Sequence, residues 1–445
     1  MKNKLLLSVL ASSFCCLCDA QPYALDLTFN PGTGALAQSW PPASATVRSI
    51  FVQSNGQIIV GGDFLTFNGQ PYNRVVRLNS DGSFDTNFYV GQGPEPYVFA
   101  VAAQTNGMIL VGGSFSAFDG VSQPNLARLR VDGSLDLSFT PSINGYLIAP
   151  ILQPGNGTIL ITGNFTQVNS QTCNGIARLS SNGALDTTFS PDITSSSITS
   201  MALDTNGNIL VAGQLTIGTN QYEVVRLMPD GALDTTFLLG PINGSVNQVE
   251  IEPDGEIIIT GGFTEIDGYS RVGIAELLSD GTVDLNFRPN SSTTYGTLLG
   301  IEADGKILTT GNGLMRANTD GSVDTSFNPI ISSVDCLTIQ QDGRFLIGGS
   351  FNTVDSTNMW GIARLQGDSL TPFQTQILNL NFYPGMQVAG SVGTVYRIES
   401  TTNLSSPGLW TPVTTFALTT TPYWFMDTNP MIPNGMRFYR AVALP

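Results

Sequence analysis

Two glycine-centred turns recur seven times along this chain and limit its fold more than any other property. The first turn is an Asn-Gly or Asp-Gly pair followed by an apolar strand, and its copies are spaced by 51, 50, 50, 48, 50 and 38 residues. Such self-similarity is typical of architectures in which each repeat is one supersecondary unit. The first turns are Asn55-Gly56, Asn106-Gly107, Asn156-Gly157, Asn206-Gly207, Asp254-Gly255, Asp304-Gly305 and Asp342-Gly343.

Each unit reads as four short strands, which in the first unit are residues 47–52, 57–64, 74–79 and 83–88. The chain shows no convincing helical period, so the predicted fold class is all-β. Antiparallel four-stranded units of this length stack radially, which predicts a seven-bladed β-propeller and leaves a linear solenoid as the alternative. Residues 26–29 repeat the end of a unit, so we expect them to add a strand to the last blade.

The first twenty residues have the layout of a secretory signal peptide. Lys2 and Lys4 precede an apolar stretch at residues 5–18, and small residues lead to Ala20. The stretch is too short to span a bilayer, and no other segment is long and apolar enough to do so. We therefore expect cleavage near Ala20 and a secreted or cell-surface protein, with a lipoprotein as the alternative because the stretch contains cysteines.

The composition changes after residue 373. Residues 21–373 carry the repeats and form the predicted propeller, whereas residues 374–445 are rich in Thr, Pro and aromatic residues. Clean alternation of apolar and polar residues at 396–400 indicates a strand. We expect residues 374–445 to form a separate, small β-sandwich-like module.

Charge and residue counts exclude several classes of function. The chain has no histidine, which removes Ser-His-Asp catalysis and histidine-ligated zinc sites. Its net charge is −16 with 18 Lys and Arg residues, so we expect no nucleic-acid partner. Outside the signal segment the chain has two cysteines, Cys173 and Cys336, too few for a disulfide scaffold. We expect a monomer without a cofactor.

The second turn contains a pair of opposite charges. A three-residue loop with glycine in the left-handed position places an Arg opposite an Asp eight residues later. Such cross-strand pairs are expected to be structural. Glu276 replaces the Arg in the fifth unit, opposite Asp284, and the seventh unit lacks the Asp. The expected pairs are Arg77 with Asp85, Arg128 with Asp136, Arg178 with Asp186, Arg226 with Asp234, and Arg316 with Asp324.

Calcium is a second interpretation of these acidic turns. Each combines an Asp beside the glycine with a second Asp four residues on, as in Asp81 and Asp85. Calcium takes six to eight oxygen ligands, and two carboxylates fall short of that number. The interpretation that adjacent blades share an ion stays open.

Aromatic residues outside the repeat motif are the candidates for ligand binding. They lie in the variable stretches between or within units, where loops carry function, and flat rings stack on sugar faces. These loop aromatics are Tyr72, Tyr97, Tyr146, Tyr222, Tyr269, Tyr295 and Trp360.

An enzyme is the rival interpretation. Carboxylate pairs hydrolyse glycosides without histidine, and Glu250 and Glu252 alternate along one strand, facing either the central channel or solvent. No acidic pair stands out as a catalytic couple. We therefore predict a non-catalytic binding or surface-interaction protein whose partner is a polysaccharide or an extracellular protein. The alternative is a carboxylate-dependent glycoside hydrolase or lyase with its site in the central channel.

The repeat also resembles a known family. The pattern Asn-Gly-x-Ile-Leu-Val-Gly-Gly-x-Phe at residues 106–115, with Ala-Arg-Leu-x-x-Asp-Gly-Ser-Leu-Asp-x-x-Phe at 127–139, resembles the delta-60 repeats of secreted bacterial β-propeller-like proteins. The resemblance covers about residues 26–373. It implies a propeller and an extracellular location, and it brings no established catalytic residues.

Overall fold

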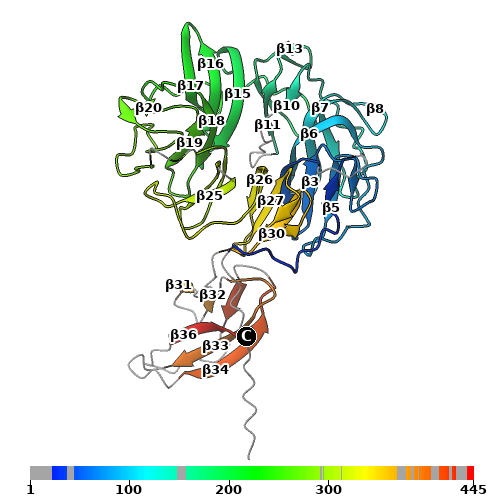
Figure 1. Cartoon of the computed structure of the whole chain (residues 1–445), viewed down its shortest axis with the longest axis vertical. Coiled ribbons are helices and arrows are strands. Elements are labelled where there is room, and N and C mark those ends of the chain that lie inside the picture. Colours follow the sequence, from blue (N-terminus) through cyan, green and yellow to red (C-terminus); the bar gives the residue numbers. More distant parts are fainter. Residues whose placement is uncertain are drawn as a thin grey trace, which may run out of the picture.

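The structure is a computed structural model in which all regular secondary structure is β. No helix occurs in the part of the chain that it describes (Figure 1). The expected signal peptide and the expected boundary after residue 373 lie outside the described residues. Those residues are 23–37, 45–147, 157–290, 293, 295–311, 313–367, 377–381, 385–388, 390–401, 410–419, 423–426 and 438–444.

The repeats form seven antiparallel sheets within these residues. The first four are β2 (Val47–Val52), β3 (Ile58–Gly62) and β5 (Val75–Leu78); β6 (Pro94–Ala103), β7 (Ile109–Phe118), β8 (Val121–Ser122) and β9 (Leu126–Leu129); β10 (Tyr146–Leu147), β11 (Ile159–Asn164) and β14 (Ile176–Leu179); and β15 (Ile193–Leu203), β16 (Ile209–Ile217) and β17 (Asn220–Leu227). The other three are β18 (Val246–Ile251), β19 (Ile257–Gly261) and β22 (Ile274–Leu277); β23 (Leu298–Ile301), β24 (Ile307–Gly311) and β25 (Gly313–Ala317); and β26 (Val334–Ile339), β27 (Phe345–Gly349) and β30 (Ile362–Leu365).

Four short strand pairs extend the repeats at their loops. They are β1 (Ala35–Leu36) with β4 (Thr66–Phe67), β12 (Gln167–Val168) with β13 (Gln171–Thr172), β20 (Glu265–Ile266) with β21 (Tyr269–Ser270), and β28 (Thr353–Val354) with β29 (Thr357–Asn358). In the sixth repeat β24 ends at Gly311, which pairs with Gly313 at the start of β25, so this repeat is shorter between its two turns.

The predicted fourth strand is reduced to a single bridge in the first six units. In the first repeat Leu78 pairs with Phe84, and the same bridge recurs in the next five repeats. The chain then turns. The amide of Asp85 donates to the carbonyl oxygen of Arg77 at 3.1 Å, and the amide of Phe88 donates to the carbonyl oxygen of Asp85 at 3.2 Å. Gly82, in the loop between the paired residues Leu78 and Phe84, has φ of 88°, a conformation that favours glycine.

Neighbouring sheets pack face to face through apolar side chains. Ile59 and Val75 of the first sheet, both fully buried, join a cluster with Ile109 and Val111 of the second. The first sheet also contacts the last, through β2 and β26, and Figure 1 shows β26 and β27 beside β3. Gly348 allows this approach, since a Cβ there would lie 2.6 Å from Val47 Cγ1.

The N-terminal segment supplies the missing edge of the last repeat, as the sequence predicts. Leu25 forms a bridge with Leu365, and the amide of Asp26 donates to the carbonyl oxygen of Arg364 at 2.8 Å. The Asp26 carboxylate, 1% exposed, then lies 2.8 Å from Arg364 Nε and 2.9 Å from Arg344 Nη1. Asp26 therefore takes the place of the Asp that the seventh unit lacks.

The C-terminal residues form two further three-stranded sheets. Glu399 joins two strands of the second sheet, because it accepts hydrogen bonds from Arg397 and Arg440, each at 2.8 Å. Tyr396 and Ile398 are buried in its core. The sheets are β31 (Ile377–Asn381), β32 (Gly385–Val388) and β35 (Tyr423–Met426), and β34 (Thr411–Ala417), β33 (Val395–Thr401) and β36 (Phe438–Ala443).

Replacing Asp26 is expected to destabilise the whole repeat array. The variant D26A leaves the buried guanidinium of Arg364 without its carboxylate, which costs about 3–5 kcal/mol of unfolding free energy. Burial by itself raises the pKa of Asp26, but hydrogen bonds from Thr28, Arg344 and Arg364 hold that pKa well below its usual range. The wild-type advantage should therefore shrink as pH falls below about 4.

Denaturant unfolding of D26A and wild type at pH 7 and pH 3 measures this effect. L27A is the control, because Leu27 is the adjacent residue and is 79% exposed. Equal stability of D26A and wild type at pH 7 would show that the N-terminal segment does not hold the last repeat.

Candidate functional site

The repeated arginine makes three contacts that join one repeat to the next. Arg77 Nη2 lies 2.7 Å from Asp85 Oδ2, and both side chains are 5% exposed. The Arg77 guanidinium carbon lies 4.5 Å from the ring centre of Phe88. Arg77 Nη1 donates to the carbonyl oxygen of Val131, in the second turn of the next repeat, at 2.7 Å. We call this arrangement the arginine latch.

The latch recurs around the repeats. Arg128, Arg178 and Arg226 likewise donate to the carbonyl that precedes the acidic or amide residue of the next turn. Arg364 of the last repeat donates to Ser80 in the first repeat, at 2.6 Å. Arg316 Nη1 also donates to the Glu302 carboxylate, at 2.9 Å.

The structure brings together all ten residues of the expected pairs. We interpret their role as structural, because each guanidinium lies between its own sheet and its neighbour. The shortest nitrogen–oxygen separations are 2.7 Å for Arg77 with Asp85, 2.7 Å for Arg128 with Asp136, 2.7 Å for Arg178 with Asp186, 2.7 Å for Arg226 with Asp234, and 2.6 Å for Arg316 with Asp324.

The turn carboxylates that suggested calcium hold their own turns. Asp81 Oδ1 accepts hydrogen bonds from the Ser83 hydroxyl at 2.6 Å and the Ser83 amide at 2.9 Å. These bonds lower the pKa of Asp81. Since Asp85 is engaged by Arg77, each carboxylate of this turn has a structural partner of its own.

Two of the seven loop aromatics come together on the surface. The rings of Tyr97 and Phe99 stack with centres 6.1 Å apart, and Phe99 meets Tyr146 edge-on at 6.2 Å. Tyr97 is 44% exposed and Tyr146 is 38% exposed. Arg48 of the first repeat lies 5.6 Å from the Phe99 ring centre and pairs with Asp63 at 3.1 Å. We call Tyr97, Phe99 and Tyr146 the aromatic strip.

Sequence reasoning missed Phe99, although its spacing of two residues from Tyr97 on one strand was a usable signal. The other predicted aromatics lie apart from the strip. Tyr269 is exposed on the β20–β21 hairpin, whereas Tyr72, Tyr222 and Trp360 are half-buried. Tyr295 is 4% exposed and belongs to the core between the fifth and sixth sheets, so it is withdrawn as a ligand-loop residue.

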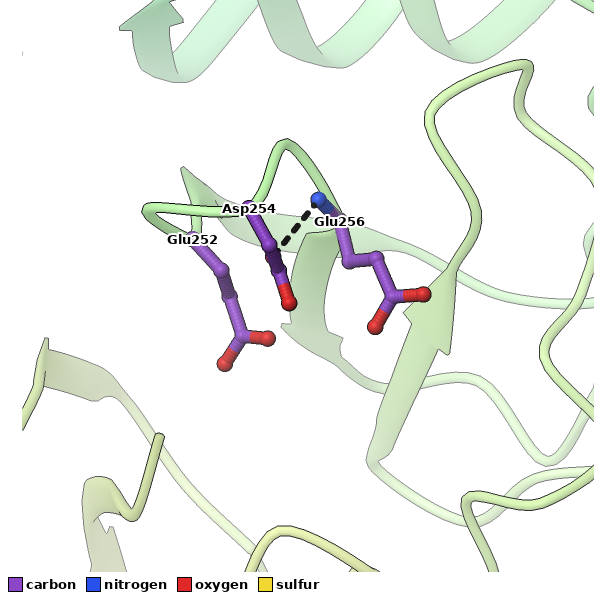
Figure 2. A group of neighbouring side chains, drawn as sticks. All are labelled: Glu252, Asp254 and Glu256. Atoms are coloured by element: carbon purple, nitrogen blue, oxygen red, sulfur yellow. Dashed lines mark hydrogen bonds between the residues drawn. The ribbon is translucent and has the colours of Figure 1, made fainter. Parts of the chain in front are cut away.

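Five carboxylates gather in the fifth repeat, and we call Glu252, Asp254, Glu256, Glu276 and Asp284 the acidic cluster. Figure 2 shows Glu252, Asp254 and Glu256 projecting from the turn between β18 and β19. The Glu256 amide donates to Asp254 at 3.1 Å and holds this turn. Oxygen atoms of these three residues lie within 4.8 Å of one another, as do those of Glu256, Glu276 and Asp284.

Burial and mutual repulsion perturb these groups. Burial, and then the carboxylates of Glu256 and Glu252, raise the pKa of Glu276 to about 9. Burial, and then Asp254 and Glu256, raise the pKa of Glu252 to about 7. Glu276 is therefore protonated at neutral pH unless a positive charge offsets the negative charges of its neighbours.

Glu250 lies on the same sheet face as Glu276. It pairs with Ile258 across the sheet, and Ile258 pairs with Glu276, so these three side chains share one face. Ile258 packs with Leu298 and Ile307 of the sixth repeat. Burial raises the pKa of Glu250 to about 7.

Comparisons with known proteins agree with this fold. A family described as domain of unknown function (DUF5122) β-propeller matches residues 53–88, 104–139, 155–189, 205–237, 252–287, 302–327 and 340–369. No curated protein sequence matches the chain.

Solved structures resemble the chain at low sequence identity. The extracellular domain of the one-component system BT4673 from B. thetaiotaomicron aligns with a TM-score of 0.51 and 13% identity. The alignment covers 84% of this chain and 45% of that domain, so the chain spans less than half of its length. The WD40 β-propeller domain of Doa1 aligns with a TM-score of 0.44 and 13% identity, over 75% of this chain and 96% of that one. The first likeness supports the fold alone.

Membrane insertion through helices finds no support in the described residues. None of them forms a helix that is long and apolar enough to cross a bilayer.

The acidic cluster is expected to make stability fall as pH rises. Between the usual pKa of 4.5 and about 9, folded Glu276 keeps a proton that the unfolded chain releases. The unfolding free energy then decreases with pH, by at most about 1.4 kcal/mol per pH unit for this group. Denaturant unfolding at pH 5, 6, 7 and 8, in a buffer with chelator, measures the slope. E276Q should flatten it, and parallel slopes would contradict the assignment.

Proposed function

The chain belongs to the DUF5122 β-propeller family, and from this premise we propose that it is an exported, non-catalytic binding protein that recognises a polysaccharide. An extracellular protein is the second class of partner. The proposal treats the repeats as delta-60 repeats and the protein as a monomer. Export is inferred from the signal-peptide pattern of residues 1–20.

We propose that the seven sheets are the blades of a closed ring. The contact of β2 with β26 and the hydrogen bond from Arg364 to Ser80 support this, because both join the last repeat to the first. The two C-terminal sheets would form the small β-sandwich-like module. A closed ring leaves no long sheet edge exposed and holds its loops in fixed positions.

The aromatic strip is the observation that carries the binding proposal. Tyrosine rings that are rigid and partly exposed supply contact area at low entropic cost. The apolar faces of pyranose rings stack on such surfaces. Polar groups border the strip, since Asn164 Nδ2 donates to the Tyr146 hydroxyl at 3.3 Å and Arg48 lies near Phe99. Rings flanked by hydrogen-bonding groups fit a sugar chain, which is apolar on its faces and polar at its edges.

Truncating the two tyrosines of the strip is expected to weaken retention on polysaccharides. The double variant Y97A/Y146A should weaken binding by about tenfold or more, which corresponds to about 1.4 kcal/mol per tenfold. Protein beginning at Gln21 is incubated with soluble and insoluble polysaccharides, and retention and new reducing ends are read in the same wells. Y269A is the matched control, because Tyr269 is equally exposed and lies outside the strip.

The outcomes separate the alternatives. Equal losses in Y269A and Y97A/Y146A would remove the strip as the binding surface. New reducing ends from wild type would contradict a non-catalytic role and favour the carboxylate-dependent enzyme. Absence of retention on every polysaccharide would leave an extracellular protein as the partner class.

A further inference from the structure

The fifth and sixth repeats place different charges at the same four positions. In the sixth repeat these positions hold Glu302, Lys306, Arg316 and Asp324, two acids and two bases. Arg316 Nη1 lies 2.9 Å from Glu302 and its Nη2 lies 2.6 Å from Asp324. Lys306 Nζ lies 4.0 Å from Asp324. The set is therefore charge-balanced.

The fifth repeat keeps both acids and reverses both bases. Glu252 and Asp284 correspond to Glu302 and Asp324, whereas Glu256 replaces the lysine and Glu276 replaces the arginine. The corresponding positions now hold four carboxylates. The other partners of a latch arginine remain. Asp284 lies eight residues after Glu276, and Phe287, whose ring is buried, lies eleven residues after it.

Glu276 is the buried member of this set and has no positive partner. Its side chain is 5% exposed, and its carboxylate forms no ion pair with any residue in the described ranges. The side-chain hydrogen bond that it forms in the described ranges is with the carboxyl group of Glu256, so its hydrogen-bonding partner is another acid. Its oxygen atoms point at the carboxylates of Glu256 and Asp284, within 4.8 Å. An isolated buried carboxylate is costly unless something compensates it.

The nearby guanidinium of Arg271 does not supply that compensation. Its Nη2 donates to the backbone carbonyl of Asp284 at 2.8 Å, and its Nη1 donates to the carbonyl of Ser270 at 2.9 Å. Asp284 Oδ1 accepts from the amide of Asn286 at 2.8 Å, which fixes the carboxylate toward the cluster. Glu276 therefore stands at the position that an arginine has in the other repeats, with carboxylate oxygens of Glu256 and Asp284 within 4.8 Å.

We propose that the fifth repeat binds a hard divalent cation, with calcium as the best fit, between the carboxylates of Glu256, Glu276 and Asp284, with Glu252 completing the site. Hard cations prefer carboxylate oxygens, and calcium takes six to eight of them in flexible geometry. Four carboxylates offer up to eight oxygens. The cation takes the role that the latch arginine has in the other repeats, since it holds the turn, the strand and the bridge of one sheet together.

Thermal unfolding of the protein beginning at Gln21, with calcium chloride or with EDTA, tests this proposal. Calcium is expected to raise the wild-type melting temperature by several degrees and EDTA to lower it, because an ion that binds the folded state stabilises it. Isothermal titration should give one ion per chain. E276Q, which keeps the shape of the side chain, should lose the calcium response.

Rebuilding the sixth-repeat set is the sharper test. E256K/E276R restores the charges of Lys306 and Arg316, so it should be stable in EDTA and indifferent to calcium. E265Q is the control, because Glu265 is exposed on β20 in the same repeat and outside the acidic cluster. It should respond to calcium as wild type does.

Two results would overturn the proposal. The first is a wild-type melting temperature that is the same in calcium and in EDTA. If E276Q also melts at a higher temperature than wild type in either condition, a shared proton compensates the cluster. The second is calcium binding of equal strength in wild type and E276Q, which would place the ion elsewhere.

Discussion

A buried guanidinium that contacts two repeats at once is the interaction on which the structure depends. Each repeat is a sheet of three or four strands and cannot cover its own apolar faces, so its stability comes from its neighbours. Arg77 shows how neighbours are aligned: its carboxylate and aromatic partners are in its own repeat and its carbonyl partner is in the next. Arginine suits this task because its planar group donates in several fixed directions, which lysine does not.

The variants of this contact explain the irregular repeats. In the last repeat the latch uses Asp26 from the N-terminal segment, so residues far apart in sequence complete one unit. In the sixth, Arg316 contacts Glu302 and the ring of Tyr23. In the fifth, Glu276 removes the guanidinium altogether. The repeated arginine thus pairs with an Asp of its own unit in most repeats and with Asp26 in the last, and in the fifth repeat a carboxylate takes its place.

The parts of this structure that could be predicted are those with local causes. The turn geometry places Arg and Asp eight residues apart on facing strands, so the pairing of Arg77 with Asp85 follows from the loop length. The carbonyl of Val131 could not be foreseen, because its distance depends on how two sheets pack. The predicted fourth strand was too long for a different, local reason. Asp85 turns the chain at once, because its carboxylate accepts a hydrogen bond from the Asn87 amide. This local bond competes with strand pairing, and the pattern of apolar residues does not reveal it.

The candidate surfaces show the same limit. Tyr97 and Tyr146 are about fifty residues apart and meet only because successive repeats are adjacent, and Tyr295 resembles them in sequence but is buried. The acidic cluster was visible in part, as Glu276 in the place of an arginine, but its other members come from a turn that packs beside it. The strip lies in the second and third repeats and the cluster in the fifth. Since distant sites contribute almost independently, ligand recognition and charge compensation can change separately in this scaffold.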